Sequence, residues 1–225
     1  MSTDRGTSED GPRRNRVTPL GDVVAIPLRG AWTGNRGCLH RGTDVVRFHG
    51  GSLWITCALR FKDWRLPQWA PGRFTVLFFH DEAVALAAGH RPCALCRRAD
   101  YNAYRDALVV RDGGGTRPSA AEMDRRLHGE RIVRGTHRRR LHPMPWRDLP
   151  DGAFVLLDDA PALVLGDALV PWTVTGYGAP APRPRGGRAA VITPPASIGA
   201  LRGGYRPQID PGALTRIFPT SSPDG

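Results

Sequence analysis

The sequence predicts an α+β fold in which a small zinc-stapled α/β module precedes a β-rich C-terminal part. Short runs rich in Val, Ile and Phe occur in the first 80 positions and predict strands. Segments rich in Ala and Leu, with capping residues at their ends, predict helices between residues 80 and 131. Beyond residue 151 the chain returns to strand-like runs separated by Gly, Pro and Asp.

The N-terminal region is expected to hold four strands, at residues 23–28, 44–48, 52–61 and 73–79. The last of these, RFTVLFF, is continuously apolar after its first residues, so we expect it to be buried. Between the first two strands lies WTGNRGCLHRG, residues 32–42. Its glycines and polar residues predict a loop.

Capping residues mark two of the expected helices. HDEAVALAAG, residues 80–89, has Asp81 as its N-cap, and Gly89 suits the left-handed position that ends a helix. SAAEMDRRLHGER opens with a capping box formed by Ser119 and Glu122. Each segment is therefore expected to be a helix with a defined start.

A further helix is expected to restart at Asp100, within RADYNAYRDALVV. Its spacing places three side chains on one face: Tyr101, Tyr104 and Leu108. In the C-terminal part, strands are expected in AFVLLDD, ALVLG, ALVPWTVTGY and AAVIT. Residues 179–188 are expected to form an exposed loop and residues 193–207 to contain one short helix.

These elements divide the chain into an expected order of segments. They are a disordered leader (1–16), a zinc-binding module with appended helices (17–135), a basic, proline-broken hinge (136–150), the β-rich part (151–217) and a disordered tail (218–225). The leader lacks the apolar core of a signal peptide, and no apolar run reaches about 18 residues. We therefore expect a cytoplasmic protein.

The charge of the chain favours a polyanionic partner. The net charge is +11, which is typical of proteins that bind nucleic acid. Lys62 is the only lysine, and arginine supplies the remaining positive charge. Heavy use of Arg, Ala, Gly and Pro also follows from a GC-rich genome, so charge alone does not assign the function.

The four cysteines, Cys38, Cys57, Cys93 and Cys96, predict a zinc site. Cys93 and Cys96 form a C-x-x-C turn, which brings two sulfurs toward one point, and the other two lie far away in sequence. In a reducing compartment, clustered cysteines point to a metal or to redox chemistry rather than to a disulfide. The alternatives are a redox pair, which normally lies at a helix N-terminus, and two inert buried thiols. His40 and His90 are reserve ligands.

The run from Phe74 to Arg98, FTVLFFHDEAVALAAGHRPCALCRR, resembles the N-terminal metal-binding module of the Ada-type DNA alkylation-repair family. The shared features are a strand with aromatic residues, a short helix with A-x-A-A-G, and R-P-C-x-x-C. LWITC, ending in Cys57, resembles the strand that leads into the first cysteine pair of that family. The resemblance implies a four-cysteine zinc site in a small α/β domain that contacts DNA through arginines.

The chain departs from the family at the methyl-accepting cysteine pair. The family has C-x-x-x-C there, but Phe61 stands four residues after Cys57, so Cys38 is expected to supply the missing ligand. The other parts of the repair protein have no counterpart, because no PCHR-like motif occurs. Four arginines near the expected site are candidates for phosphate contacts, or for simple charge compensation: Arg36, Arg91, Arg97 and Arg98.

Three functions are compatible with these residues. The first is a non-catalytic zinc protein that binds nucleic acid, DNA in preference to RNA, through arginines. The second is an enzyme, either a zinc-thiolate alkyl acceptor or a nuclease or hydrolase whose site includes His40. The third is a structural zinc site with a C-terminal part that binds a small molecule or a protein. Trp64, Trp69, Trp146 and Trp172 could stack on unpaired bases or fill the core, and each histidine taken alone is expected to be a surface or capping residue.

Overall fold

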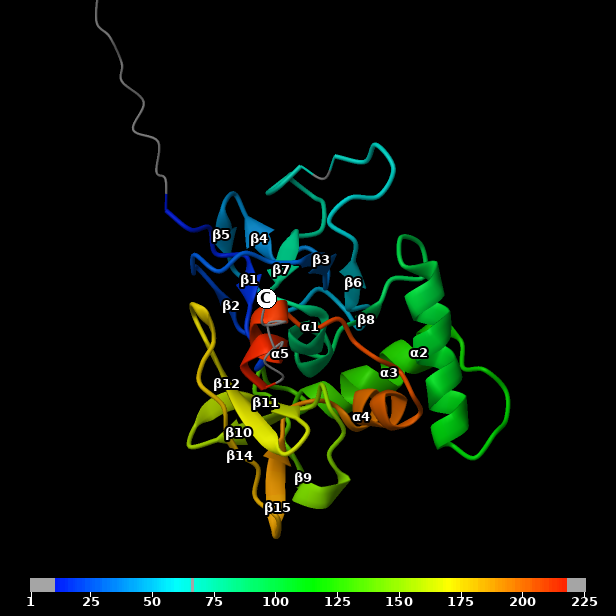
Figure 1. The fold of residues 1–225 in the computed structure, drawn as a ribbon. Coiled ribbons are helices and arrows are strands. Elements are labelled where there is room, and N and C mark those ends of the chain that lie inside the picture. Colours follow the sequence, from blue (N-terminus) through cyan, green and yellow to red (C-terminus); the bar gives the residue numbers. More distant parts are fainter. Residues whose placement is uncertain (1–10, 66, 218–225) are drawn as a thin grey trace, which may run out of the picture.

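The computed structural model describes residues 11–65 and 67–217, which form two β-sheets and a group of helices (Figure 1). The mixed α+β class is as predicted. Residues 1–10 of the expected leader and the expected tail, 218–225, lie outside the described residues. Residues 14–16 belong to the fold, since Arg14 donates to the Val23 carbonyl, Asn15 is only 1% exposed and Arg16 pairs with Phe78. The prediction of a disordered leader over residues 1–16 was therefore wrong at the end of that range.

The first sheet is mixed and has six strands in the order β2-β1-β7-β3-β6-β8. Its strands are β1 (Arg16–Val17), β2 (Val23–Val24), β3 (Trp32–Asn35), β6 (Ile55–Cys57), β7 (Leu77–Phe79) and β8 (Arg91–Pro92). The β1–β7 and β6–β8 pairs are parallel, and the others are antiparallel. A separate hairpin joins β4 (His40–Arg41) to β5 (Asp44–Val45).

Strand β3 lies within the segment that was expected to be a loop. A Cβ atom at Gly34 would lie 2.2 Å from the Ile55 carbonyl oxygen and 2.9 Å from the Phe79 ring. The glycine therefore permits a close approach between neighbouring strands and does not mark a turn. The loop prediction for residues 32–35 was wrong because both uses of glycine look alike in the sequence.

The second sheet is antiparallel and confirms the β-rich C-terminal part. Its order is β13-β12-β11-β10-β15-β9, and β14 pairs with β12. Its strands are β9 (His142–Pro145), β10 (Phe154–Leu157), β11 (Ala160–Leu165), β12 (Ala168–Thr173), β13 (Gly176–Tyr177), β14 (Ala181–Pro182) and β15 (Arg188–Val191).

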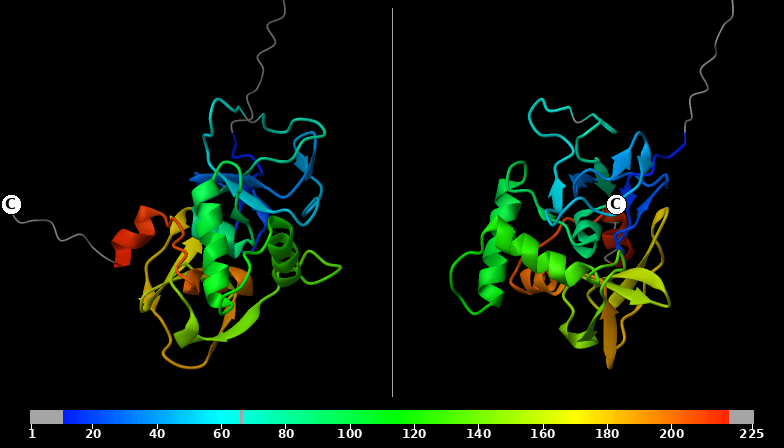
Figure 2. Two further views of the ribbon diagram at one scale, coloured as in Figure 1. Left: turned by 90° about the vertical axis from the view of Figure 1, so that its right-hand side faces the viewer. Right: turned by 180° about the vertical axis from the view of Figure 1, so that it is seen from behind.

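The helices are α1 (Glu82–Ala87), α2 (Arg98–Arg111), α3 (Ala120–Arg131), α4 (Pro195–Arg202) and α5 (Pro211–Ile217), with a 3₁₀ turn, η1 (Trp146–Asp148). The predicted caps are confirmed. Asp81 Oδ1 accepts the Val84 amide at 2.8 Å, Gly89 has φ +85°, and Ser119 and Glu122 form the capping box. Helices α2, α3 and α4 lie together on one side of the molecule (Figure 2). Among the described residues, no helix is long and apolar enough to cross a bilayer.

Both faces of the second sheet are buried. Alternate residues of its strands face the helices, where Val155 and Val164 join the core around α2, α3 and α4. Their neighbours, including Phe154 and Leu163, face the other way and join the core around α1 and the first sheet. This alternation follows from the period of two in a strand. The N-terminal and C-terminal parts therefore share their apolar cores.

The segment 136–150, expected to be a hinge, is part of this packing. Strand β9 pairs with β15 over four residue pairs. The guanidinium of Arg139 donates hydrogen bonds to the carbonyl oxygens of Ala87 and Ile192, one on each side of the expected boundary. The Arg139 side chain thus links the two parts, and strand β9 belongs to the second sheet.

Helix α1 lies between the two sheets, and all six of its residues are buried. Two carboxylates at its start hold the C-terminal segment. Asp81 accepts hydrogen bonds from the Tyr177 hydroxyl at 2.8 Å and the Asp210 amide at 3.0 Å. Glu82 accepts one from the Gln208 amide at 3.0 Å. These bonds satisfy the buried carboxylates and fix the chain end against α1.

Candidate metal centre

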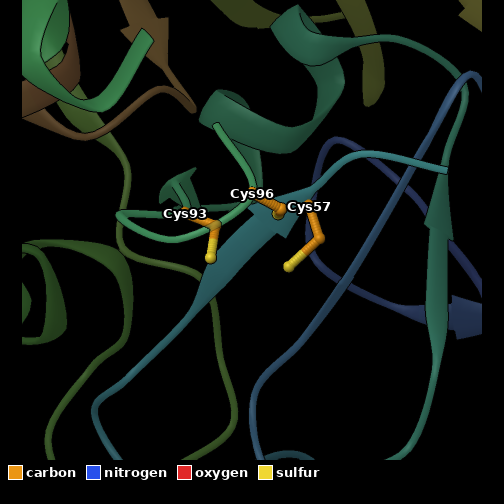
Figure 3. A group of neighbouring side chains, drawn as sticks. All are labelled: Cys57, Cys93 and Cys96. Atoms are coloured by element: carbon orange, nitrogen blue, oxygen red, sulfur yellow. The ribbon is translucent and has the colours of Figure 1, made fainter. Parts of the chain in front are cut away.

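Parallel pairing of β6 and β8 brings three cysteines together. Cys57 is the last residue of β6, and Cys93 directly follows β8. Thr56 pairs with Pro92, and the Cys93 amide donates to the Thr56 carbonyl at 2.9 Å. The ligand atoms of Cys57, Cys93 and Cys96 all lie within 4.8 Å of one another (Figure 3). This cluster could hold a metal ion.

The C-x-x-C turn is held by backbone hydrogen bonds. The Arg97 amide donates to the Cys93 carbonyl at 3.1 Å, and the Leu95 amide donates to the Cys93 sulfur at 3.4 Å. An N–H···S bond of this kind stabilises a thiolate, and such outer contacts orient a metal ligand. Gly89, in its left-handed conformation, lets the chain turn from α1 into β8 before the cysteines are reached.

The spacing of the three sulfurs fits a tetrahedral metal. Zinc–sulfur bonds of about 2.3 Å place two ligand sulfurs about 3.8 Å apart in a tetrahedron. The three sulfurs lie within 4.8 Å of one another, an upper bound about 1 Å above that spacing. Soft thiolates favour Zn²⁺, Cu⁺ or iron–sulfur clusters over Mg²⁺ or Ca²⁺.

Hydrogen bonds among the three thiols shift their pKa values in opposite directions. The pKa of Cys93 is lowered, first because Cys57 donates a hydrogen bond to its sulfur and then because Cys96 does so. The pKa of Cys57 is raised because its thiol donates to Cys93 and to Cys96. A lowered pKa favours the thiolate form of Cys93, which is the form that binds a metal.

Cys38, the expected fourth ligand, is not part of the cluster. Strand β3 runs antiparallel to β6, with Thr33 opposite Cys57 and Asn35 opposite Ile55. Each residue after Thr33 therefore moves farther from Cys57, by about 3.3 Å along the strand. The Cys38 thiol instead donates to the His40 carbonyl at 3.7 Å. The register of one strand pair thus places Cys38 away from the other cysteines.

The two reserve ligands are also held elsewhere. His40 is 9% exposed, and its ring nitrogens contact Thr75 Oγ1 at 2.6 Å and the Ala70 carbonyl at 3.3 Å. His90 is wholly buried between Phe79 and Trp54, with ring-centroid separations of 4.7 and 5.1 Å. Neither ring joins the sulfur cluster. The arrangement of His40 gives no support to a hydrolase centred on it.

Three of the four arginines that were expected to contact phosphate are buried. Arg91 forms a bidentate pair with Asp124, both N···O distances being 2.8 Å. Arg97 donates to Glu82 at 2.7 Å and stacks on Trp32, with its guanidinium carbon 3.8 Å from the ring centroid. These two arginines offset carboxylates inside the protein.

Arg36 is wholly buried as well. Its guanidinium carbon lies 4.2 Å from the Phe48 ring centroid and 4.6 Å from that of Trp54. Of the four, only Arg98 is exposed to solvent. The burial of these three side chains was not predicted, because a nearby carboxylate or ring that a distant segment supplies is invisible in the local sequence.

The three cysteines line a pocket of about 150 Å³, which we call the cysteine pocket. Its remaining walls are mostly apolar and come from Asn35, Ile55, Ala58, Leu59, Phe61, Trp64, Phe74 and Leu95. Trp64 is 58% exposed and Leu95 is 54% exposed, although both are large and apolar. The alternation of cationic and apolar residues in LRFKDWR is the sequence signal for this rim, and it was not among the predicted site features. Three protein ligands beside an open pocket are typical of zinc sites with an exchangeable fourth position.

Comparison with protein-family models, curated proteins and solved structures found no match to this chain. The likeness to the Ada-type module therefore rests on the residues from Phe74 to Arg98 and on LWITC, and it stays a prediction. The chemistry of the site must be argued from the three sulfurs and the residues around them.

Proposed function

We propose that this protein binds zinc through Cys57, Cys93 and Cys96 and binds single-stranded or unpaired DNA through the rim of the cysteine pocket. The observation that carries the proposal is the convergence of three sulfurs on an apolar pocket with exposed aromatic side chains. Zinc is the metal best suited to a thiolate set that retains one open position.

The rim combines positive charge with ring surfaces. Five exposed cations lie on the segments that line the pocket or follow the C-x-x-C turn: Arg60, Lys62, Arg65, Arg73 and Arg98. Asp63 is the only acidic residue between positions 58 and 74. Exposed Trp64 and Phe74 offer faces on which bases can stack, which contributes about 1–3 kcal/mol per base. Cations that follow the backbone and aromatic groups that stack on bases are the two components of single-strand recognition.

Metal content tests the first half of the proposal. The purified chain should carry one equivalent of zinc, and Cys57→Ser, Cys93→Ser and Cys96→Ser should each lower that content sharply. Cys38→Ser is the matched control, because Cys38 lies outside the cluster, and it should keep the metal. A parent protein without zinc, or loss of zinc in the Cys38 variant alone, would contradict the assignment.

Salt-dependent binding tests the second half. Fluorescence anisotropy with a labelled single-stranded oligonucleotide measures the binding constant. Its logarithm should fall linearly with the logarithm of the salt concentration. Arg60→Gln/Arg73→Gln should reduce the magnitude of that slope by about 1.4, since each phosphate contact on a single strand contributes about 0.7. Arg185→Gln/Arg216→Gln, on exposed arginines of the C-terminal part, is the control. Equal slopes for both double variants would reject the rim as the interface.

The open position of the cluster favours one second candidate, an alkyl acceptor. In that reaction a cysteine sulfur attacks the methyl carbon of a DNA phosphotriester. The S–C bond forms, the C–O bond breaks, and the phosphodiester leaves with the electron pair. Mass spectrometry after incubation with methylated DNA distinguishes the candidates: a methylated cysteine supports the acceptor, and an unmodified chain that retains DNA supports the binder.

A further inference from the structure

A second pocket, of about 670 Å³, lies at the C-terminal end of α3 and the turn that follows it. Six of its lining residues carry cationic or titratable groups: His49, Arg125, His128, Arg134, His137 and Arg140. No Asp or Glu lines it, and it shares no residue with the cysteine pocket. We call it the histidine pocket.

The histidines lie close to one another although they come from distant segments. His49 precedes β6, whereas His128 belongs to α3 and His137 to the turn beyond it. The His49 ring centroid is 5.1 Å from that of His128 and 6.5 Å from that of His137. The tertiary fold, not the sequence spacing, therefore builds this group.

Two wholly buried arginines lie directly behind the pocket. Arg131 donates to His128 Nδ1 at 2.9 Å, and its guanidinium carbon is 3.8 Å from the Trp54 ring centroid. Arg36 lies against the same ring. Arg36 Nε and Nη1 and Arg131 Nε have no hydrogen-bond partner among the described residues. Among the described residues, neither side chain forms an ion pair. Arg36 donates to the carbonyl of Gly21, and Arg131 donates to the carbonyls of Ser52 and Gly89.

Positive charge is therefore concentrated without a directly bonded carboxylate among the described residues: Asp22 acts on Arg36, and Asp124 on Arg131, only through space. Burial lowers the pKa of Arg36 to about 9 and that of Arg131 to about 8. Burial, followed by the charge of Arg131, also lowers the pKa of His128. A buried cation without a bonded anion is costly, and an anion bound nearby would relieve that cost.

The ring orientation supports an anionic ligand rather than a metal. Arginine can only donate, so the bond from Arg131 makes His128 Nδ1 the acceptor and leaves the proton of the neutral ring on Nε2. Nε2–H is then a donor. The nitrogens of the three histidines do not form a metal-type cluster among the described residues, and the neighbouring guanidinium groups would repel a cation.

We propose that the histidine pocket is a binding site for a phosphate group, held by Arg134, Arg140 and the pocket histidines in the positive field of Arg131 and Arg36. Guanidinium groups bind phosphate through paired, charge-assisted hydrogen bonds, which suits the exposed arginines at the rim. The ligand is a phosphate dianion or a phosphate monoester. The free ion and a terminal phosphate on a nucleic acid share this chemistry.

Isothermal titration calorimetry of the full chain with inorganic phosphate tests the site without any nucleic acid. Binding should be saturable, and Arg134→Gln/Arg140→Gln should weaken it by about tenfold or more, because each lost charged hydrogen bond contributes strongly. Both side chains are exposed, so the variant is expected to fold. Arg60→Gln/Arg73→Gln, at the rim of the cysteine pocket, is the matched control and should change the affinity less than twofold.

A second measurement locates the ligand and identifies its source. NMR spectra of the histidine rings should show shifts at His49, His128 and His137 on addition of phosphate, with none at His40. An oligonucleotide with a 5′-phosphate that competes better than its 5′-hydroxyl counterpart would identify a nucleic-acid end. If the two oligonucleotides compete equally well and inorganic phosphate still displaces the bound ligand, the ligand is the free ion. No saturable phosphate binding, or equal losses in the two double variants, would overturn the proposal.

Discussion

The buried arginines fall into two groups that differ in how their charge is balanced. Beside the cysteine cluster, Arg91 and Arg97 are paired with Asp124 and Glu82 at 2.7–2.8 Å. Beside the histidine pocket, Arg36 and Arg131 contact carbonyl oxygens and aromatic rings but no carboxylate among the described residues. All four are buried, yet only the first two form ion pairs with carboxylates; Asp22 and Asp124 act on Arg36 and Arg131 through space alone.

This difference separates arginines that hold the fold together from arginines that prepare a site. A buried ion pair leaves an uncompensated charge when one partner is removed. Removing a buried cation that forms no ion pair leaves no carboxylate without its partner, so the loss of that cation costs less folding free energy. Burial alone would have put all four residues in one class, and a direct ion pair with a carboxylate distinguishes the first two from the others.

The sharpest test of the comparison is Arg91→Met. This variant leaves the Asp124 carboxylate buried without its bidentate partner. We expect the free energy of unfolding to fall by about 3–5 kcal/mol, measured by urea denaturation. Replacing the pair together, as Arg91→Met/Asp124→Leu, should recover most of that loss, since an apolar pair of similar volume is often neutral. A loss below about 1 kcal/mol in the single variant would remove the ion pair from the first group.

The pH dependence of stability gives a smaller effect. Burial, followed by the charges of Arg36, Arg131 and Arg139, lowers the pKa of His90 well below its usual value. The unfolded chain therefore binds a proton at His90 below about pH 6.5 while the folded chain does not. The free energy of unfolding should fall as the pH drops from 7 to 5. For each pH unit, the parent should lose up to about 1.4 kcal/mol more than the His90→Phe variant. Identical slopes in urea titrations across that range would show that His90 does not contribute.

The smallest effect is expected for Arg36→Met. The side chain donates one hydrogen bond, to the Gly21 carbonyl, and a methionine keeps contact with the rings of Phe48 and Trp54. We expect a change of about 1 kcal/mol or less in the free energy of unfolding, because the lost contacts are offset by the removal of a desolvated charge. A loss as large as that of Arg91→Met would erase the distinction between the two groups.

Features set by local interactions could be predicted from the sequence. The caps at Asp81, Gly89 and Ser119 depend on residues within one turn, and each was found as expected. The C-x-x-C pair and Cys57 were also identified, since strand, turn and thiol chemistry converge on them.

Features set by long-range pairing could not be predicted. The position of Cys38 depends on the register of β3 against β6, and the burial of Arg91 depends on Asp124, which is 33 residues away. The histidine pocket combines His49 with residues beyond position 120, so no local sequence motif predicts it. Its one signal was the basic run around residues 137–140, which was interpreted as a hinge.

Trp54 is wholly buried between the segments that carry the two candidate sites. Two guanidinium groups lie against its indole ring, and the chain reaches Cys57 three residues later. The indole is thus a built-in optical reporter, whose emission responds to the electric field of the cations beside it. A titrant that neutralises those cations should change the wavelength and intensity of the indole emission. This measurement needs no attached label.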